Sequence, residues 1–525
     1  MKEKLLWSIK RDVVMWFCST EIVELSERMS SGKWNCAWWI SEEDLQTIKV
    51  AIFVVPLFVL TVFATVKNSH ICRWSWDVNC HQTDTGSYVP SPPTFQTQLH
   101  QYNETGGFNV SKPSLYEPYV NETSEPHLLM GQTRKSNILE ETEIGLAKAR
   151  AAIREARNGN RTQDSDYVPI GPVYLNAKAF HRSYLEMEKR FKVFVYGEGE
   201  PRIFLNPPCK SIHSIEGNFM HAIERNDHFR TKDPEKAHVF FLPFSVATEL
   251  RYGYERVSQD FSPQRNTVID YVNVIAARYP YWNRSLGADH FTLACHDMCR
   301  GTSLSLPDPL KNSILVLCNA NTVEGFKPAK DVSFPEINLK TGSTNSFIGG
   351  SSASKRSVLA FFAGEVQGAV IPVLLKHWEN KDEDIQVQKY LEEGISYHEM
   401  MRKNKFCLCP SGSEVASARV VEAIYSGCVP VLISEHYVPP FSDVLNWKSF
   451  SVEVSVKDIP NLKEILKSIS PRQYIRMQRR VKQIRRHFEV HSPPKRFDVF
   501  HMILHSVWLK RLNFKVHHDQ NVLSE

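Results

Sequence analysis

The stretch Phe406–Ser434, FCLCPSGSEVASARVVEAIYSGCVPVLIS, decides the fold. Its first four residues are apolar and suit a buried strand, and Pro410-Ser-Gly-Ser then indicates a loop. A helical pattern follows and ends at Gly427, a residue typical of helix C-caps, before the second apolar run Cys428–Ile433. This order of strand, loop, helix and strand is the unit from which parallel α/β sheets are built.

The loop after the first strand carries groups that suit an anion. Ser411, Gly412 and Ser413 place backbone N–H groups and hydroxyls at the expected helix N-terminus, where partial positive charge favours a phosphate or diphosphate. Arg419 adds a fixed cation on the same helix. The alternative interpretation is that one of the serines only caps the helix.

Two carboxylates complete this pattern. Glu414 and Glu422 are eight residues apart, which places them about 80° apart around a helix axis. One could then lie near a sugar and the other near a ribose. In the alternative interpretation, both glutamates only improve the helix dipole and its solubility.

Similar alternation occupies the rest of the C-terminal two thirds. Short apolar runs before and after a Gly- and Ser-rich segment at residues 341–354 read as buried parallel strands, and residues such as Asn266–Arg278 read as helices packed on them. The expected fold class is α/β, with two doubly wound, Rossmann-like domains facing a cleft and ligands at the carboxyl ends of strands. The runs are Phe191–Tyr196, Ala237–Phe244, Ile314–Cys318, Val358–Phe362, Phe406–Cys409, Cys428–Ile433 and Phe450–Val454.

Composition excludes several classes of protein. The chain has 525 residues, 42% of them hydrophobic and 23% charged, which is ordinary for globular domains and unlike disordered or multi-span membrane proteins. Lys and Arg number 63 against 58 Asp and Glu, and a net charge of +5 on so long a chain does not indicate a nucleic-acid-binding surface.

One segment predicts a membrane anchor. Val50–Val66 is free of charges and bounded by Lys49 and Lys67, at the short end of the length that spans a bilayer. A buried core helix and a cleaved signal peptide are the alternatives. The Lys and Arg counts on the two sides tie, but Asn-x-Ser/Thr glycosylation motifs favour a luminal C-terminal side and therefore a type II topology. Those motifs begin at Asn103, Asn109, Asn121, Asn160 and Asn283.

The expected domain boundaries follow from these patterns. Residues 1–49 form a cytoplasmic segment and residues 50–66 the anchor. Residues 67–183 form a luminal stem rich in Pro, Ser and Thr that ends in a helical stalk at Ile138–Arg157. Residues 184–345 and 346–494 form the N-terminal and the C-terminal Rossmann-like domains, and residues 495–525 form a closing helix and tail.

The cysteines leave their pairing open. The spacings Cys295/Cys299 and Cys72/Cys80 could support disulfides in an oxidising lumen, but sequence alone does not give the pairs. A zinc site made by Cys295, His296 and Cys299 is the alternative, although no second close pair of ligands follows at the usual spacing.

Several longer stretches resemble the plant branch of the exostosin family of glycosyltransferases, glycosyltransferase family 47. The resemblance covers about Tyr184 to Asn513 and keeps its order. It implies a GT-B fold of two Rossmann-like domains, inverting transfer from a nucleotide sugar, and a single-pass Golgi membrane protein acting in cell wall biogenesis. The stretches are MEKRFKVFVYGEGEP (187–201), AHVFFLPF (237–244), YWNRSLGADHF (281–291), LAFFAG (359–364), KFCLCPSGSEVASARVVEAIYSGCVPVLIS (405–434) and YVPPFSDVLNW (437–447).

Site roles follow as hypotheses from this resemblance. Ser411, Gly412, Ser413 and Arg419 would bind the donor diphosphate, Glu422 the ribose, and Glu414 the donor sugar or the ribose. Inverting transfer also needs a base that takes the proton of the acceptor hydroxyl.

Candidate bases lie in the first domain. They are Asp289 and His290 in the family-like ADHF, with Asp289 favoured, followed by His296 and Asp297. The alternative is that these residues form a structural network at a strand end. A departure from the family pattern is Ile371, where relatives commonly have an Arg that could contact phosphate.

Two further patterns are interpreted as structural. Asp382-Glu-Asp384 resembles a metal-binding D-x-D motif but lies in a charged stretch. Asp164-Ser-Asp166 has the same pattern but lies outside the expected domains. We therefore expect no metal and no cofactor besides the nucleotide sugar. The basic run Arg472–Arg486 has apolar residues at helical spacing, which predicts one core face and one solvated cationic face.

The sequence thus predicts a glycosyltransferase that moves a sugar, expected to be UDP-linked, to a cell-wall polysaccharide. Its partners would be the nucleotide sugar, the polysaccharide acceptor, the membrane through one helix and possible complexes with other glycosyltransferases, with no nucleic acid. The alternative is a subunit of the same fold that binds glycan or assembles a complex with little or no catalysis.

Overall fold

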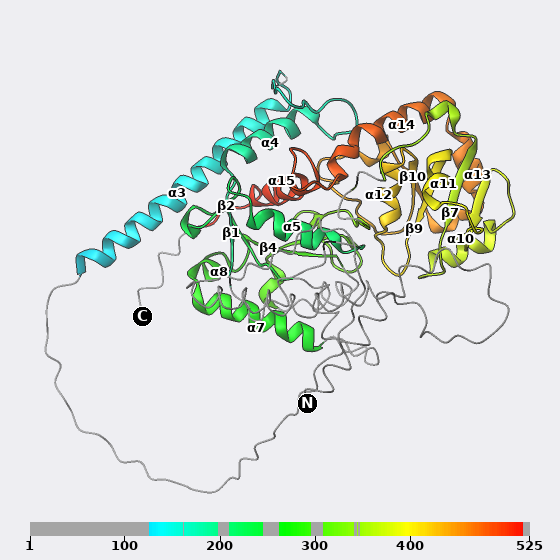
Figure 1. The fold of residues 1–525 in the computed structure, drawn as a ribbon. Coiled ribbons are helices and arrows are strands. Elements are labelled where there is room, and N and C mark those ends of the chain that lie inside the picture. Colours follow the sequence, from blue (N-terminus) through cyan, green and yellow to red (C-terminus); the bar gives the residue numbers. More distant parts are fainter. Residues whose placement is uncertain are drawn as a thin grey trace, which may run out of the picture. The chain divides into compact units, whose positions relative to one another are not determined.

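The computed structural model describes residues 125–160, 162–197, 209, 211–244, 262–295, 308–340, 344 and 347–517 (Figure 1). The expected membrane anchor at residues 50–66 and the glycosylation motifs at Asn103, Asn109 and Asn121 lie outside these residues. Among the helices of the described ranges, none combines the length and the apolar character that a membrane span requires.

The first of two sheets is entirely parallel. Its strand order is β2-β1-β3-β4-β5-β6, and the strands β3, β4 and β5 are buried along their whole length. Continuous burial explains the unbroken apolar runs, because helices cover both faces of such a sheet. The strands are β1 Val193–Val195, β2 Arg230–Thr231, β3 Val239–Phe241, β4 His290–Ala294, β5 Ile314–Leu317 and β6 Val332–Ser333.

The second sheet is also parallel and has the order β11-β10-β9-β7-β8. Numbered from its own first strand, it repeats the order 2-1-3-4-5 that the first sheet also contains. In doubly wound sheets of this order, ligands bind where the order reverses, between the first and third strands. That point lies between β7 and β9. The strands are β7 Val358–Ala363, β8 Ile385–Gln388, β9 Asn404–Pro410, β10 Val429–Ile433 and β11 Val452–Val454.

Helices connect and cover these strands (Figure 1). The α-helices are α3 Glu125–Ala156, α4 Ala177–Arg190, α5 Ser214–Glu224, α7 Ser262–Arg278, α8 Pro280–Ser285, α10 Val370–Trp378, α11 Tyr397–Lys403, α12 Ala418–Tyr425, α13 Leu462–Ser468, α14 Pro471–Ile484 and α15 Val499–Arg511. The 3-10 helices are η2 Pro234–Lys236, η3 Asp308–Lys311, η4 Ala353–Lys355, η5 Trp447–Ser449, η6 Val456–Asn461 and η7 Arg485–Phe488.

The helix expected to form a stalk packs on the globular part instead. It runs from Glu125 to Ala156 and lies along α4, as Figure 1 shows, with Leu146 and Ala149 fully buried in the core. Arg150 donates from Nε to the carbonyl oxygen of Leu512 at 2.6 Å. The sequence did not reveal this buried face of the helix, because alanines make up part of it and differ little in hydrophobicity from the exposed positions.

The last helix returns to the first sheet. Helix α15 packs on β5, β6 and α4, and its Trp508 is fully buried. Asp498 caps this helix by accepting a hydrogen bond from the N–H of His501 at 3.2 Å. The C-terminal segment therefore belongs to the core of the N-terminal sheet as well as following the second sheet in sequence.

Among the described residues, two disulfides link neighbouring strands. Cys295 pairs with Cys318, which links the ends of β4 and β5, so the Cys295/Cys299 pair that the spacing allowed does not form and Cys295 is not available as a zinc thiolate. Cys407 pairs with Cys428, which links β9 to the start of β10. Adjacent parallel strands bring these residues to similar heights in the sheet, and sequence spacing does not reveal that.

Candidate functional site

The carboxyl ends of β7 and β9 meet through their following loops. Gly368, in the loop after β7, has a φ of +61°, and a Cβ atom there would lie 1.8 Å from the carbonyl oxygen of Gly412 in the loop after β9. A side chain at Gly368 is therefore excluded both by backbone conformation and by space. This contact fixes the two loops against each other at the point where the strand order reverses.

The helix after β9 begins later than the sequence predicted. Helix α12 starts at Ala418, and Ser411, Gly412, Ser413 and Glu414 belong to the preceding loop, so the 80° relation expected for the two glutamates is wrong. The N–H of Ser411 donates to Ile433 at 3.0 Å and extends the ladder of the sheet. Ser411 is buried, and the next three residues are half-buried.

Hydrogen bonds to residues that follow strands of the first sheet fix the position of this loop. The N–H of Ala416 donates to Oδ1 of Asn319 at 3.1 Å, and the N–H of Ala418 donates to Oε1 of Glu336 at 3.2 Å. Asn319 follows β5 and Glu336 follows β6. These bonds satisfy backbone donors that an earlier helix start would have used, which is why local sequence alone placed the helix too early.

Arg419 reaches the carboxyl end of β7. It lies in the first turn of α12, and its guanidinium carbon is 5.1 Å from the centroid of the Phe362 ring. A Cβ atom built on Gly364 would lie 2.2 Å from Nη2 of Arg419. Gly364 therefore leaves the space that the guanidinium occupies, and the structure brings the predicted cation to the β7/β9 switch point.

Glu422 lies one turn further along α12, near Arg419. Tyr397, the first residue of α11, lies near enough to Glu422 to influence its pKa. Burial raises the pKa of Glu422, while the Arg419 charge and the Tyr397 hydroxyl act in the opposite direction. Two predicted donor-binding residues are thus together, and Tyr397 is a third member that sequence reasoning missed, since a single Tyr in a polar segment gave no signal.

A buried thiol lies close to the same charges. Cys409 is free, only 3% exposed, and burial raises its pKa to about 12. Arg419 lowers and Glu422 raises the pKa of this thiol, so both charges act on it. Because reactive cysteines need a lowered pKa and access, Cys409 fills space beneath the site as an apolar group.

The ends of the two sheets contact each other near α12. The N–H of Val438, after β10, donates to Ala320 at 2.9 Å, and the N–H of Thr322 donates to His436 at 3.0 Å. In the same region the carboxylates of Glu336 and Glu414 lie within 4.8 Å of each other and of the Cys318 sulfur. That sulfur is in a disulfide, so this group offers two carboxylates rather than a three-ligand metal site.

Comparison with known proteins identifies the family. Residues 187–469 match the Exostosin GT47 domain, which is more than half of the chain. The chain belongs to the exostosin GT47 family. It is therefore a glycosyltransferase, as the sequence resemblance predicted.

Relatives from plants agree with this assignment. The chain is 62% identical to a probable glycosyltransferase of Arabidopsis thaliana, over 79% of this chain and 80% of that protein. A second probable glycosyltransferase of the same species is 55% identical over 71% of this chain and 81% of that protein. A probable beta-1,4-xylosyltransferase, also of Arabidopsis thaliana, is 28% identical over 63% of this chain and 83% of that protein.

Asp289 and His290 lie at the opposite end of the first sheet of this GT47 glycosyltransferase. Both are buried at the amino end of β4, and Asp289 is 1% exposed. Asp289 accepts hydrogen bonds from Ser285 Oγ at 2.6 Å and Arg284 Nη2 at 3.1 Å, and lies 2.8 Å from His290 Nδ1. The other ring nitrogen of His290 bonds the Tyr196 hydroxyl at 2.8 Å.

This geometry favours the second interpretation of Asp289, a structural network. The pKa of the carboxyl is held well below its usual range: burial would raise it, but His290, Arg284 and Ser285 outweigh that effect. The hydrogen-bond partners of the Asp289 carboxylate are side chains of the protein itself, so an acceptor hydroxyl would have to displace one of them. The roles of Asp289 and His290 as base stay predictions, and His296 and Asp297 lie outside the described residues.

The acidic D-x-D stretch forms ion pairs with lysines. Asp382 lies 2.5 Å from Lys463, and Asp384 lies 3.1 Å from Lys463 and 2.9 Å from Lys467. Both aspartates precede β8 and therefore lie at the amino end of the sheet, away from the switch point. Their charge is compensated locally. Asp164 pairs in the same way with Arg496 at 2.9 Å.

Ile371 lies in α10 of the second sheet and is fully buried in the core. At this position the GT47 glycosyltransferase therefore presents an apolar side chain to its own interior. Arg419 supplies a cation at the neighbouring strand ends instead. That the loss of the relatives' arginine at Ile371 removes a phosphate contact stays a prediction.

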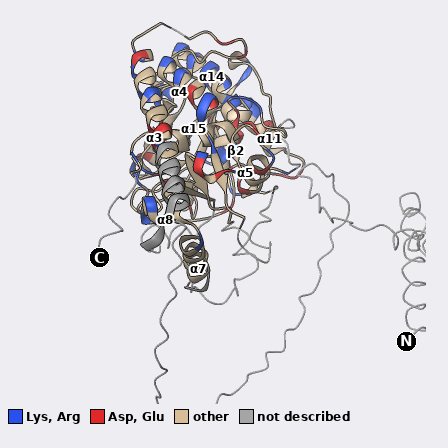
Figure 2. Cartoon of the chain, turned by 90° about the vertical axis from the view of Figure 1, so that its left-hand side faces the viewer, with Lys and Arg blue, Asp and Glu red and all other residues tan. Residues whose placement is uncertain are grey.

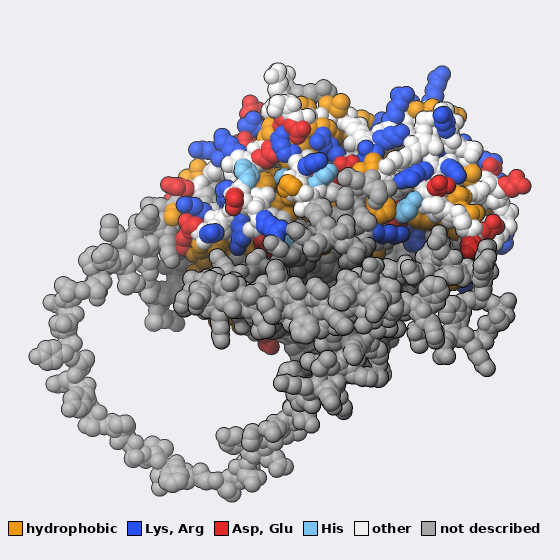
Figure 3. Space-filling view, in the orientation of Figure 1, with side chains coloured by type: hydrophobic (Ala, Val, Ile, Leu, Met, Phe, Trp, Pro, Cys, Tyr) orange, Lys and Arg blue, Asp and Glu red, His pale blue; other side chains and the backbone are white. Residues whose placement is uncertain are grey.

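The basic run forms α14 as predicted. Tyr474, Met477 and Val481 are buried, whereas the cationic face points outward. Figure 2 colours much of this helix blue for Lys and Arg, and Figure 3 shows blue side chains on the surface where Figure 1 places α14. Ile475, which the pattern assigned to the core face, is 36% exposed.

The two glycosylation motifs within the described residues are accessible. Asn160 and Asn283 are exposed, and Asn283 lies in α8, where its Nδ2 donates to Ala276 at 3.2 Å. Their modification stays a prediction.

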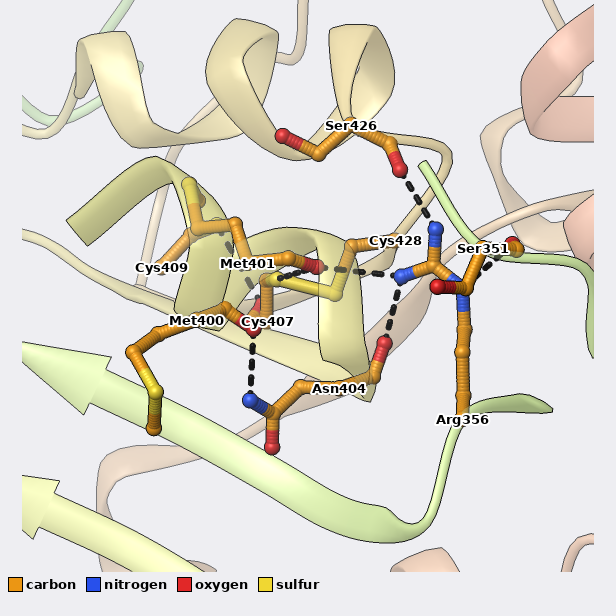
Figure 4. The surroundings of a disulfide bond; sticks show 9 residues. All are labelled: Ser351, Arg356, Met400, Met401, Asn404, Cys407, Cys409, Ser426 and Cys428. Atoms are coloured by element: carbon orange, nitrogen blue, oxygen red, sulfur yellow. Dashed lines mark hydrogen bonds between the residues drawn. A yellow bond between two sulfur atoms is a disulfide. The ribbon is translucent and has the colours of Figure 1, made fainter. Parts of the chain in front are cut away.

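A buried arginine supports the strand that carries the site. Arg356 is 2% exposed and donates to the carbonyl oxygens of Ser351 at 3.0 Å, Met401 at 3.0 Å, Asn404 at 2.6 Å and Ser426 (Figure 4). Ser351 precedes η4, and the other three carbonyls belong to the ends of α11 and α12 and the start of β9. Together with the Cys407–Cys428 disulfide shown in the same figure, Arg356 fixes both helices that hold Tyr397 and Glu422.

Proposed function

We propose that the chain transfers a sugar from a UDP-linked donor to a cell-wall polysaccharide with inversion, on a GT-B fold. The observation that carries this proposal is the grouping of Arg419 and Glu422 on α12 at the β7/β9 switch point. Two parallel sheets of the same strand order, whose carboxyl ends contact each other, support the GT-B arrangement. The named relatives, including a probable beta-1,4-xylosyltransferase, support a wall glycan as acceptor.

Different residues would bind different parts of the donor. The guanidinium of Arg419 would bind the diphosphate, because charge-assisted hydrogen bonds to phosphate oxygens are strong and directional. The free backbone N–H groups of the loop containing Gly412 and Ser413 would add donors, as loops before helices do for phosphates. Ser411 is less accessible and would act through its backbone, and Glu414 would face the donor sugar.

The reaction requires one bond to form as another breaks. An acceptor hydroxyl oxygen attacks the anomeric carbon from the side opposite the diphosphate, and the bond from that carbon to the diphosphate oxygen breaks. The hydroxyl proton passes to a base, and the nucleoside diphosphate leaves with the bonding electron pair. Arg419 stabilises the charge that develops on this leaving group, which is its catalytic contribution.

We also propose that the protein is a type II, single-pass protein of the Golgi membrane. The support is the charge-free segment at residues 50–66 and the glycosylation motifs that follow it. Asn160 and Asn283 are exposed, which a glycan requires. Digestion of the cellular protein with an endoglycosidase should increase its mobility on a gel, and an unchanged mobility would count against luminal exposure.

Titration of the purified full-length protein with a panel of nucleotide sugars tests the activity. We expect a UDP-sugar to bind and to release UDP slowly by hydrolysis. Arg419→Ala should weaken binding by roughly tenfold or more, the scale of hydrogen bonds to a charged group. The matched control is Arg472→Ala, which removes an exposed guanidinium on α14.

The outcome also separates the enzyme from its alternative. A protein that binds no nucleotide sugar, or one whose nucleotide release is equal in wild type and Glu422→Gln, would support a glycan-binding or assembly subunit. Equal effects of Arg419→Ala and Arg472→Ala would remove the switch point as the donor site.

A further inference from the structure

An unpaired amide donor lies where the carboxyl ends of the two sheets meet. Asn319 follows β5 and is only 5% exposed, and its Nδ2 atom is buried without a hydrogen-bond partner among the described residues. Its Oδ1 atom accepts a hydrogen bond from the N–H of Ala416, in the loop after β9, at 3.1 Å. A backbone N–H can only donate, so this bond identifies Oδ1 and leaves Nδ2 as the unused donor.

Two acceptor groups lie at the same junction. Asn319 directly follows Cys318, whose sulfur lies within 4.8 Å of a carboxylate oxygen of Glu336 and of one of Glu414, and these two oxygens are within the same distance of each other. Glu336 follows β6 in the first sheet, whereas Glu414 lies in the loop after β9 in the second. Both glutamates are half-buried, so the junction is reached from the surface. The two sheets thus bring one amide donor and two carboxylates to one place.

These groups suit a ligand that carries hydroxyls. A buried donor without a partner has lost its hydrogen bonds to water, so a ligand that accepts from Nδ2 of Asn319 restores one of them. The carboxylates only accept, so the same ligand must also donate. A hydroxyl does both, whereas a metal cation cannot accept from an N–H and an ionised diphosphate has no proton to donate. A sugar, with hydroxyls on adjacent carbons, therefore fits this group.

We infer that Asn319, together with Glu336 and Glu414, binds the sugar of the nucleotide-sugar donor: one sugar hydroxyl accepts from Nδ2 of Asn319 and donates to a carboxylate. This inference rests on the proposed function and extends it, because it adds residues of the first sheet to the donor site. The donor sugar is favoured over the acceptor glycan because the loop that carries Glu414 also contains Gly412 and Ser413. These are the proposed backbone donors to the diphosphate, and the donor sugar is bonded to that diphosphate.

Comparison of UDP with its sugar conjugates isolates the sugar contacts. The measurement is calorimetric titration of the full-length protein with UDP, UDP-xylose, UDP-glucose and UDP-galactose. Asn319→Asp keeps an oxygen for the N–H of Ala416 but removes the Nδ2 donor. The ratio of UDP-sugar to UDP affinity should therefore fall about three- to tenfold, the scale of one lost hydrogen bond. The matched control is Asn321→Asp, since Oδ1 of Asn321 accepts from the N–H of Val323 at 3.1 Å, and its ratio should equal that of wild type.

Removal of single hydroxyls from the ligand provides the second readout. For the sugar that binds, one monodeoxy analogue lacks the hydroxyl that contacts Asn319. Its loss of affinity relative to the parent sugar should be present in wild type and absent in Asn319→Asp, because the contact is already missing in that variant. The double variant Glu336→Gln/Glu414→Gln keeps an oxygen for the N–H of Ala418 but removes both carboxylates, so it should also lower the ratio of UDP-sugar to UDP affinity. A purely structural role of Asn319 would not couple it to one hydroxyl.

The results that would overturn this inference differ from those that would overturn the proposed function. An unchanged ratio in Asn319→Asp or in the double glutamine variant, with UDP still bound, would overturn the sugar site alone. The same follows if wild type binds UDP but none of the three UDP-sugars, or if each deoxy analogue loses equal affinity in wild type and Asn319→Asp. A ratio that requires Mn²⁺ and is lost with EDTA would indicate a cation between the carboxylates and would also overturn it. Absence of UDP binding by the wild-type protein would overturn the proposed function.

Discussion

Replacing Gly364 by Ala should impair donor binding with little effect on folding. A Cβ atom at this position would lie 2.2 Å from Nη2 of Arg419, 3.2 Å from its Cζ and 3.3 Å from Cζ of Phe362. The closest atom is the far end of a flexible side chain, so the guanidinium can retreat. It would need to move by roughly 1 Å to reach an ordinary contact distance.

The size of each effect follows from what the movement costs. Displacing Arg419 from the Phe362 face sacrifices a cation–π contact of about 0.5–2 kcal/mol, and part of this is recovered by hydration and by the lower chain entropy of Ala in the unfolded state. The free energy of unfolding should therefore change by less than about 1 kcal/mol. Binding of UDP loses a charge-assisted contact of about 1.5–3 kcal/mol, which corresponds to roughly ten- to a hundredfold.

Calorimetric titration with UDP and urea unfolding of the same samples would measure both quantities. Gly145→Ala in α3 is the matched control, since a Cβ atom there would lie 3.8 Å from Nη1 of Arg190 in α4 and alanine favours the helix. Gly368→Ala should instead destabilise the fold, because its Cβ would meet backbone atoms of Gly412. Wild-type UDP affinity in a folded Gly364→Ala protein would refute the placement of Arg419 in the donor site.

Three stability predictions come from contacts away from the proposed ligand. Arg356→Met should lower the free energy of unfolding in urea by about 3–5 kcal/mol, because four buried carbonyl groups lose their donor; a loss below about 1 kcal/mol would contradict this. Replacing Cys295 and Cys318 together by Ser should cost about 3 kcal/mol, the chain-entropy value for a closed loop of 23 residues, and unchanged unfolding would refute it. The pKa of Asp164 is lowered, chiefly by its hydrogen bonds from Arg496, so the stabilisation is complete above the unfolded pKa of about 4 and is lost as pH falls. Acid titration of stability should accordingly be steeper in wild type than in Arg496→Met, and parallel curves would refute the pairing.

The sequence predicted most of the strands that are apolar and buried, but it missed the buried strand β4, His290–Ala294. The apolar runs at β5, β7, β9 and β10 lie where expected, because a parallel strand covered by helices must be apolar throughout. Strands β2 and β6 have only two residues each, and β8 alternates as IQVQ, so none produces a continuous apolar signal. These three are at the edges of their sheets. Strands β2 and β8 are partly exposed there, whereas β6 is buried but too short to produce a pattern.

The site was predictable in its chemistry and less so in its geometry. Arg419 and Glu422 were identified from a helical pattern that the structure confirms from Ala418 onward. The start of that helix was not predicted correctly. The backbone N–H groups of Ala416 and Ala418 donate to Asn319 and Glu336, which lie almost a hundred residues earlier in the chain. Long-range hydrogen bonds of this kind override local propensity, and no local pattern announces them.

Position along the strands distinguishes the proposed donor-binding residues from the polar network in the first sheet. Both sheets contain the order 2-1-3-4-5, and the sequence suggested Arg419 for donor binding in one and Asp289 as the base in the other. Arg419 follows the carboxyl end of β9, where loops leave backbone donors free, whereas Asp289 precedes β4 at the amino end and has its partners within the fold. Before a polar motif in an α/β protein is assigned to binding, its position at the amino or the carboxyl end of its strand has to be known. In this chain, a search for residue types alone overlooks that β4 begins at His290.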